Sequence, residues 1–334
     1  MPGASIPELR FLSASDVVAA MPPLDERLRL AERTLTALVA DAELPAKIGI
    51  HPRPAGSFVH AMPAFLRGAD PDGGEDLVGM KWVAGFATNN ALGIPSINAV
   101  VVLNDAATGL PTAILDGGPI TAMRTAAVSG VAIRRFAPEI TGRAPSAALV
   151  GAGTQGRSHL AVLGHALPGV SLTLFDRHPE RAAALADEAE STAGIGTVSE
   201  AADSQAAVRD ADVVVTAASF GPVRQVMTND WLADGALVVP VDYATYCAAE
   251  VARDAAIFLV DERGQFLANR DAGLFDDYPD PTATLGEAIL DGMRRPASGR
   301  VVVTHLGVGL ADVVFGAAIV RRAEALGLGT ALPR

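Results

Sequence analysis

The chain has 334 residues, half of them apolar and only 5% aromatic, so its length suits two domains with cores of small aliphatic side chains. A net charge of −12 leaves no basic patch to neutralise phosphates, which argues against nucleic-acid binding. Cys247 is the only cysteine, so no internal disulfide can form and we expect a reducing compartment.

The beginning of the chain carries no targeting signal. Residues 1–10 lack a basic segment followed by a long apolar stretch, which is the pattern of a signal peptide. No run of about 18 uncharged apolar residues occurs, so we expect no membrane span. Together these observations predict a cytoplasmic protein.

The first 141 residues predict a helix, a sheet and a second helix. Residues 15–41 carry leucines at helical spacing, and residues 120–136 form a long helical pattern that Thr121 would begin. Short apolar segments separated by turns, one of them at 70–74, indicate an antiparallel sheet between the two helices. These segments lie at 47–50, 58–62, 77–83, 97–103 and 111–115.

From residue 142 the pattern changes to strands that alternate with helices. Alternation of this kind predicts a parallel sheet wound with helices. The tail at 308–327 predicts an amphipathic helix that could pack on the N-terminal domain. The expected strands lie at 147–150, 171–175, 213–216, 236–241, 257–260 and 301–304.

The most specific local motif is GAGTQG at residues 151–156. A short apolar run precedes it, a helical pattern follows it, and Asp176 stands 20 residues past Gly156 at the end of a second apolar run. This combination is the fingerprint of dinucleotide binding, in which the glycines let the backbone approach a pyrophosphate at a helix N-terminus. A Gly-rich turn in an Ala- and Gly-rich chain is the alternative, and the strand, helix and acid around the motif argue against it.

The acid after the second strand also bears on the choice of cofactor. Asp176 would bind the ribose hydroxyls of NAD and repel the 2′-phosphate of NADP. Arg177 beside it could instead accommodate that phosphate. We expect NAD, with NADP as the alternative.

Several motifs together resemble the ornithine cyclodeaminase/mu-crystallin family over most of the chain. They include Lys81-Trp82, Gly93-Ile-Pro95 and Leu103-Asn-Asp105, and the specific one is the Thr-x-x-Arg-Thr-Ala-Ala run at 121–127 ahead of the glycine motif. The resemblance implies a homodimer that uses a nicotinamide cofactor on 2-amino acids or their imines.

The resemblance also implies the fold. We expect an α/β protein in which residues 142–305 form a Rossmann domain that binds NAD(P). Residues 1–141 with 306–334 would form an α+β domain for substrate binding and dimerisation, built from the N-terminal segment and the C-terminal helix.

Three residues match the family's reaction centre. Arg124 would clamp the substrate carboxylate with its planar fork, Lys81 would contact the carboxylate or the imine, and Asp242 would handle the proton on nitrogen or on water. Each has a plainer reading: a surface arginine, a lysine with its stem packed on a strand, and an aspartate that caps a helix.

Two positions depart from the cyclodeaminase pattern. His60 stands where those enzymes have a glutamate for the side-chain amine, and Lys47 stands in place of an arginine that helps bind the carboxylate. His60 could act as a proton shuttle near neutral pH or simply be a packed side chain. No metal site is expected. Cofactor contacts are expected from Gly151, Gly153, Thr154, Gln155, Gly156, Asp176, Arg177, Thr125, Thr216 and His305, the last of these where the final Rossmann loop should reach the nicotinamide.

The resemblance, with these residues, implies hydride transfer at the α-carbon of an amino or imino acid, as in a ketimine reductase or an amino-acid dehydrogenase. One alternative is ornithine cyclodeamination, in which L-ornithine gives L-proline and ammonia while NAD+ is recycled. A second is a non-catalytic, crystallin-like protein that binds NAD(P) or a ligand without turnover.

Overall fold

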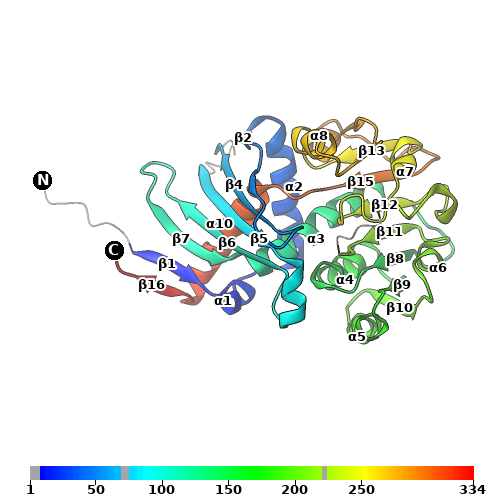
Figure 1. The fold of residues 1–334 in the computed structure, drawn as a ribbon, viewed down its shortest axis with the longest axis horizontal. Coiled ribbons are helices and arrows are strands. Elements are labelled where there is room, and N and C mark those ends of the chain that lie inside the picture. Colours follow the sequence, from blue (N-terminus) through cyan, green and yellow to red (C-terminus); the bar gives the residue numbers. More distant parts are fainter. Residues whose placement is uncertain (1–7, 69–74, 220–223) are drawn as a thin grey trace, which may run out of the picture. The chain divides into compact units, whose positions relative to one another are not determined.

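A computed structural model describes residues 8–68, 75–219 and 224–334 (Figure 1). The turn expected at 70–74 lies outside these residues, as does most of the N-terminal segment 1–10. The chain divides into two compact units, residues 1–124 with 308–334 and residues 125–307. The sequence predicts boundaries at 141/142 and 305/306, whereas the first division between the units falls inside helix α3 (Gly117–Phe136), whose second half belongs to the larger unit.

The first unit contains a sheet in the order β16-β1-β7-β6-β5-β4-β2, with β3 paired to β4. The five strands expected from the sequence pair antiparallel, and β1 joins β7 in parallel. Three strands of two to four residues were not expected, because such short segments show no periodicity. The strands are β1 (Leu9–Leu12), β2 (Ala42–Glu43), β3 (Ile48–Ile50), β4 (Phe58–Leu66), β5 (Leu77–Gly85), β6 (Ile97–Asn104), β7 (Pro111–Asp116) and β16 (Thr330–Leu332).

Helices α1 (Ala14–Ala19), α2 (Leu24–Ala40) and α10 (Gly309–Leu326) complete this unit, with a 3₁₀ turn η1 (Ala87–Leu92). The single helix expected at 15–41 is two helices, because Pro22 and Pro23 cannot continue one. Helix α10 packs against α2 and strands β4, β5 and β6. It approaches closely at Gly79, where an added Cβ would lie 3.2 Å from Val313. This close packing brings Asp312 of α10 to strand β5.

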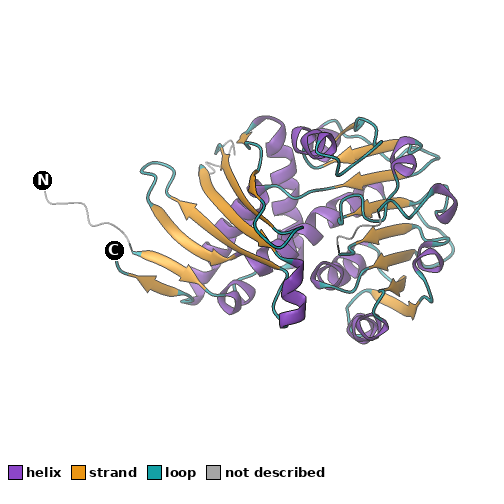
Figure 2. Ribbon diagram, viewed as in Figure 1, coloured by secondary structure: helices purple, strands orange, loops and turns teal. Residues whose placement is uncertain are grey.

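The second unit is built on a sheet in the order β10-β9-β8-β11-β12-β15-β13-β14, in which every pair is parallel. Helices flank this sheet, as expected from the alternating pattern (Figure 2). The strands are β8 (Ser146–Val150), β9 (Val170–Phe175), β10 (Ile195–Glu200), β11 (Val213–Thr216), β12 (Leu237–Pro240), β13 (Ile257–Val260), β14 (Ala283–Thr284) and β15 (Val301–Thr304). The helices are α4 (Thr154–Ala166), α5 (Pro179–Glu190), α6 (Ser204–Val208), α7 (Ala249–Arg253), α8 (Arg263–Asp271) and α9 (Leu285–Leu290), with η2 (Asn229–Trp231).

The strand order fixes where a ligand can bind in this unit. The chain leaves β8 toward β9 on one side and returns to β11 on the other, so β8 and β11 flank the point where the winding reverses. In open parallel sheets, ligands bind at the carboxyl ends of the strands at such a point. The predicted fold class, a Rossmann-like parallel sheet with a second sheet domain, is therefore confirmed.

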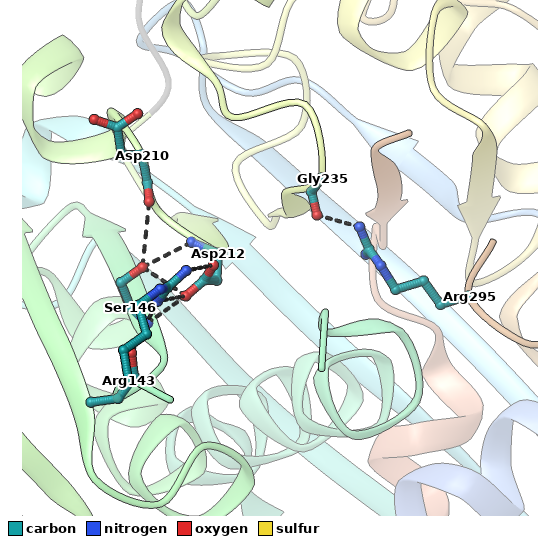
Figure 3. Close-up of polar contacts among 7 residues, drawn as sticks. Arg143, Ser146, Asp210, Asp212, Gly235 and Arg295 are labelled. Carbon is teal, nitrogen blue, oxygen red and sulfur yellow. Dashed lines mark hydrogen bonds and ion pairs between the residues drawn. The ribbon is translucent and has the colours of Figure 1, made fainter. Parts of the chain in front are cut away.

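The opposite, amino ends of β8 and β11 are joined by a buried carboxylate (Figure 3). Arg143 donates to both oxygens of Asp212 at 2.6 Å, and the N–H and hydroxyl of Ser146 each donate to its Oδ2 at 2.8 Å. Nearby, Arg295 donates to the carbonyl of Gly235, just before β12. The bonds of Asp212 link the amino ends of β8 and β11, away from the expected ligand site.

Within the described residues, no helix is long and apolar enough to cross a membrane.

Candidate active site

The glycine loop of the second unit, residues 151–156, packs tightly at two of its three motif glycines and is open at the third. Gly151 has a φ of +108°, and an added Cβ would lie 2.5 Å from the carbonyl oxygen of Ala217. A Cβ on Gly156 would overlap the Gly151 carbonyl oxygen. A Cβ on Gly153, in contrast, would meet no described atom within 4 Å, and Gly153 caps α4 without a side-chain hydrogen bond. Two glycines thus permit tight backbone packing, while the third leaves space at the start of α4, where a pyrophosphate would lie.

Asp176 is fixed against this loop. Its Oδ2 accepts a hydrogen bond from the N–H of Ala152 at 2.7 Å, and its Oδ1 accepts one from the N–H of His178 at 2.9 Å. Arg177 is exposed, and its Nε donates to the His178 ring at 3.2 Å. The carboxylate is therefore oriented by backbone donors at the end of β9, beside the glycine loop.

The other residues expected at the cofactor lie around the same strand ends. Thr154 and Gln155 form the first turn of α4, and Gln155 Oε1 is a buried acceptor without a partner in the described part of the chain. Thr125 is buried in α3, and Thr216 ends β11 next to the switch point. These positions are compatible with a cofactor contact, which stays a prediction for each of them.

Asp242 follows β12 and is almost completely buried. Thr216 Oγ1 donates to its Oδ1 at 2.9 Å, and the N–H of Ala218 donates to its Oδ2 at 3.0 Å. Burial raises the pKa of this carboxyl to about 7, although both hydrogen bonds work in the opposite direction. A side chain that changes its protonation state near neutral pH can serve as an acid or a base.

His305 belongs to a buried hydrogen-bonded chain in the same unit. Its Nε2 lies 2.9 Å from Ser129 Oγ, which lies 2.8 Å from His159 Nε2, and His159 Nδ1 lies 2.6 Å from the Gln155 carbonyl. Burial lowers the pKa of His159 to about 4, so its ring is neutral at pH 7. Because a carbonyl only accepts, His159 Nδ1 carries the proton, Ser129 donates to Nε2, and His305 must donate to Ser129. The network thus assigns the His305 proton to Nε2.

The first unit holds a buried ion cluster. Lys81 on β5 donates to Asp312 Oδ1 at 3.1 Å and to Thr121 Oγ1 at 2.6 Å, and Arg124 Nε donates to the same Asp312 oxygen at 3.4 Å. Lys81 is 1% exposed, Arg124 6% and Asp312 not at all. Burial first, then Arg124 and Lys47, lower the pKa of Lys81 to about 8, while Asp312 raises it. The cluster carries one surplus positive charge, which suits a carboxylate ligand.

Asp312 was missed by the sequence reasoning. It lies on α10 within an otherwise apolar stretch from Val308 to Ile319. An acid inside such a stretch must be paired, because burying an unpaired charge is costly. The apolar stretch around Asp312 therefore indicates a buried ion pair, but the sequence does not show that Lys81 and Arg124 are its partners.

His60 lies on β4 two residues before Met62, which pairs with Lys81 across the sheet. The His60 ring stacks on Phe58 at 4.6 Å and packs against Gly49. Burial, with Lys47 and His51, lowers the pKa of His60 to about 4. Such a ring is neutral and only weakly basic at pH 7, which argues against a proton shuttle and for the packing role.

The predicted residues thus fall into two groups. Lys47, His60, Lys81 and Arg124 belong to the first unit, whereas the glycine loop, Asp176, Thr216, Asp242 and His305 belong to the second. Among residues 8–68, 75–219 and 224–334, no three His, Cys, Asp or Glu side chains are arranged to hold a metal ion.

The chain is similar to known proteins in both sequence and structure. The model of the ornithine cyclodeaminase/mu-crystallin family matches residues 11–318. A nodulation efficiency protein of Rhizobium meliloti is 36% identical over 97% of this chain and 98% of its own length. The ketimine reductase mu-crystallin of Mus musculus is 27% identical over 77% of this chain and 78% of its own.

A solved structure supports the fold over the whole length. The Δ1-pyrroline-2-carboxylate reductase of Thermococcus litoralis, in complex with NADH and L-proline, superimposes with a TM-score of 0.83 at 24% identity. The match covers 97% of this chain and all of that one. With the family model matched over residues 11–318, this chain belongs to the ornithine cyclodeaminase/mu-crystallin family.

Proposed function

We propose that the protein is an NAD(H)-dependent oxidoreductase of the ketimine reductase or amino-acid dehydrogenase type. The observation that carries the proposal is the pairing of Lys81 and Arg124 on one buried aspartate, together with a buried Asp242 whose pKa is raised to about 7. Buried ionisable groups with shifted pKa values are typical of catalytic sites, and each unit holds such a group, which argues against a protein that only binds a ligand.

The proposed roles follow from the donors that each side chain has left. Arg124 uses Nε on Asp312, so its two Nη groups can form a bidentate pair with the substrate carboxylate. Lys81 has a third ammonium hydrogen beyond those given to Asp312 and Thr121. Asp242 holds or releases the proton of the substrate nitrogen.

The glycine loop, Asp176, Thr216 and His305 are the proposed cofactor residues. The open space at Gly153 and the uncapped start of α4 fit a pyrophosphate. When bound, NAD(H) supplies or accepts the hydride at the substrate α-carbon. A carboxylate at Asp176 favours the free ribose hydroxyls of NAD over the phosphate of NADP.

The charge around His60 favours this activity over ornithine cyclodeamination. A cyclodeaminase must hold a second, positively charged amine and take a proton from it. Here the neutral His60 lies near Lys47 and His51. The acid of the buried ion cluster, Asp312, is already shared by Lys81 and Arg124. We therefore propose a substrate whose side chain carries no ammonium group.

The proposed assembly is a homodimer formed through the open face of the first sheet. A row of apolar residues crosses four strands of that face: Ile48 pairs with Ala61, Ala61 with Trp82, and Trp82 with Val100. Ile48 is 68% exposed, Trp82 44% and Val100 37%. A second copy of the same face would bury this row. Light scattering should show a dimer that Trp82→Glu converts to monomers, and a monomeric wild type would refute the assembly.

The activity is tested by absorbance of the reduced nicotinamide. Purified protein is given NADH or NADPH, each with a panel of cyclic 2-imino acids, and we expect steady oxidation of NADH with at least one of them. Ammonia release from L-ornithine with NAD+, without net oxidation of NADH on any imino acid, would instead establish a cyclodeaminase. Binding of NADH without either reaction would leave a non-catalytic protein.

A further inference from the structure

The ion cluster of the first unit contains one residue whose role the proposed function does not assign. Asp312 comes from α10, Lys81 from β5 and Arg124 from α3, so three separate elements meet at one carboxylate oxygen. The second oxygen, Oδ2, is buried and has no hydrogen-bond partner in the described part of the chain. A carboxylate oxygen only accepts, so Oδ2 offers nothing to an anionic ligand, and a substrate carboxylate at this cluster would contact the two cations alone.

We infer that Asp312 is the positioning residue of the substrate carboxylate site, because it holds Lys81 Nζ and Arg124 Nε on one oxygen and leaves their other donors to the substrate. This inference rests on the proposed function. A purely stabilising role would explain Asp312 less well, because a buried ion pair often contributes little net stability to a fold.

The geometry divides the donors of each cation. Thr121 Oγ1 donates to the carbonyl of Gly117 at 2.6 Å, so it accepts from Lys81 and fixes one ammonium hydrogen. Asp312 fixes a second, and the third remains for the substrate. On Arg124, Asp312 engages Nε and leaves the planar pair of Nη groups, which is the half of the fork that matches a carboxylate.

Asp312 also keeps Lys81 charged. The charged groups that act on Lys81 are Asp312 on α10, Arg124 on α3, and Lys47 between β2 and β3. Only Asp312 among them favours the ammonium form, while burial and both cations oppose it. Without that carboxylate, Lys81 would lose its proton at a lower pH and would attract an anion over a narrower pH range.

The test uses carboxylate binding, so that it does not depend on turnover. The full-length protein with NADH is titrated with pyrrole-2-carboxylate, a flat cyclic acid without a reducible imine, by calorimetry from pH 6 to 9. For the wild type we expect affinity to fall above a pH of about 8, where Lys81 loses its proton. For Asp312→Asn we expect this decline to begin at least about one pH unit lower, with affinity reduced about tenfold at pH 8.

Two further variants separate positioning from folding. Asp312→Glu keeps the charge and shifts the carboxylate by one methylene, so we expect weaker binding at every pH with the decline unmoved. Asp212→Asn makes the same chemical change at the buried carboxylate that joins β8 and β11 in the second unit, and we expect it to lower stability without changing carboxylate affinity or its pH dependence. If Asp312→Asn does not fold, the response of Asp312→Glu decides the question.

The outcomes distinguish the inference from the function on which it rests. Wild-type affinity and an unmoved decline in Asp312→Asn, or unchanged affinity in Asp312→Glu, would overturn the positioning role alone. A wild-type protein that binds NADH but no 2-carboxylate would overturn both the role and the proposed substrate class.

Discussion

Thr216 Oγ1 donates a hydrogen bond of 2.9 Å to Asp242 Oδ1, which links the carboxyl ends of the neighbouring strands β11 and β12. A hydrogen bond to the charged form of a carboxyl lowers its pKa, so Thr216 partly offsets the effect of burial on Asp242. The pair therefore places the titration of Asp242 near neutral pH.

Removing that bond should shift the pH dependence of catalysis. With an amino acid and NAD+, the rate should rise with pH through about 7, because the base form of Asp242 is required. Thr216→Val should move this rise to higher pH, and Asp242→Asn should lower kcat by roughly 10²–10⁴-fold. Steady-state rates from pH 5.5 to 9 provide the measurement. A Thr216→Val profile that coincides with the wild type would show that Asp242 is not the group that titrates.

The buried Asp242 should also lower the free energy of unfolding at pH values where its carboxyl is ionised. Its folded-state pKa of about 7 exceeds the unfolded value of 3.8, so between these values only the folded state binds the proton. Stability should therefore fall as the pH rises from 4 to about 7, by at most about 4 kcal/mol. Asp242→Asn should be more stable than the wild type at pH 8, by about 1–3 kcal/mol, and lose this advantage near pH 4. Urea unfolding at the two pH values checks the sign.

The glycine loop offers a matched pair of substitutions. Gly156→Ala should lower the unfolding temperature, because its Cβ overlaps the Gly151 carbonyl, at a cost of about 1–3 kcal/mol. Gly153→Ala should keep the wild-type unfolding temperature, since its Cβ meets no described atom within 4 Å, but should bind NADH more weakly. Thermal unfolding and NADH fluorescence titration measure both. Unimpaired NADH binding by Gly153→Ala would place the pyrophosphate elsewhere.

The tautomer of His305 can be observed directly. Nitrogen-15 NMR of histidine-labelled protein should show the proton of His305 on Nε2 and that of His159 on Nδ1, as the hydrogen-bond directions require. Ser129→Ala removes the link, and the His305 signals should then change toward a mixture of tautomers. An Nδ1-protonated His305 in the wild type would refute the assigned direction.

The sequence predicted those parts of the molecule that depend on local pattern. The glycine motif with Asp176 identified the Rossmann unit, because spacing along the chain and geometry coincide in a strand–turn–helix. Pro22 and Pro23 should have divided the first helix, and the run of leucines obscured that signal.

The contacts of Asp312 with Lys81 and Arg124 could not be predicted. The residues lie 231 and 188 positions apart, and only the packing of α10 on the sheet brings them together. The sequence could likewise not show that the His60 ring stacks on Phe58, which is a matter of side-chain orientation in the folded sheet.

The chain from His305 through Ser129 to His159 ends on the carbonyl oxygen of Gln155. A peptide carbonyl is far too weak a base to take up a proton and pass it on, so this row of side chains cannot conduct a proton past Gln155. It can hold the His305 imidazole in one orientation, but it cannot deliver a proton from bulk water.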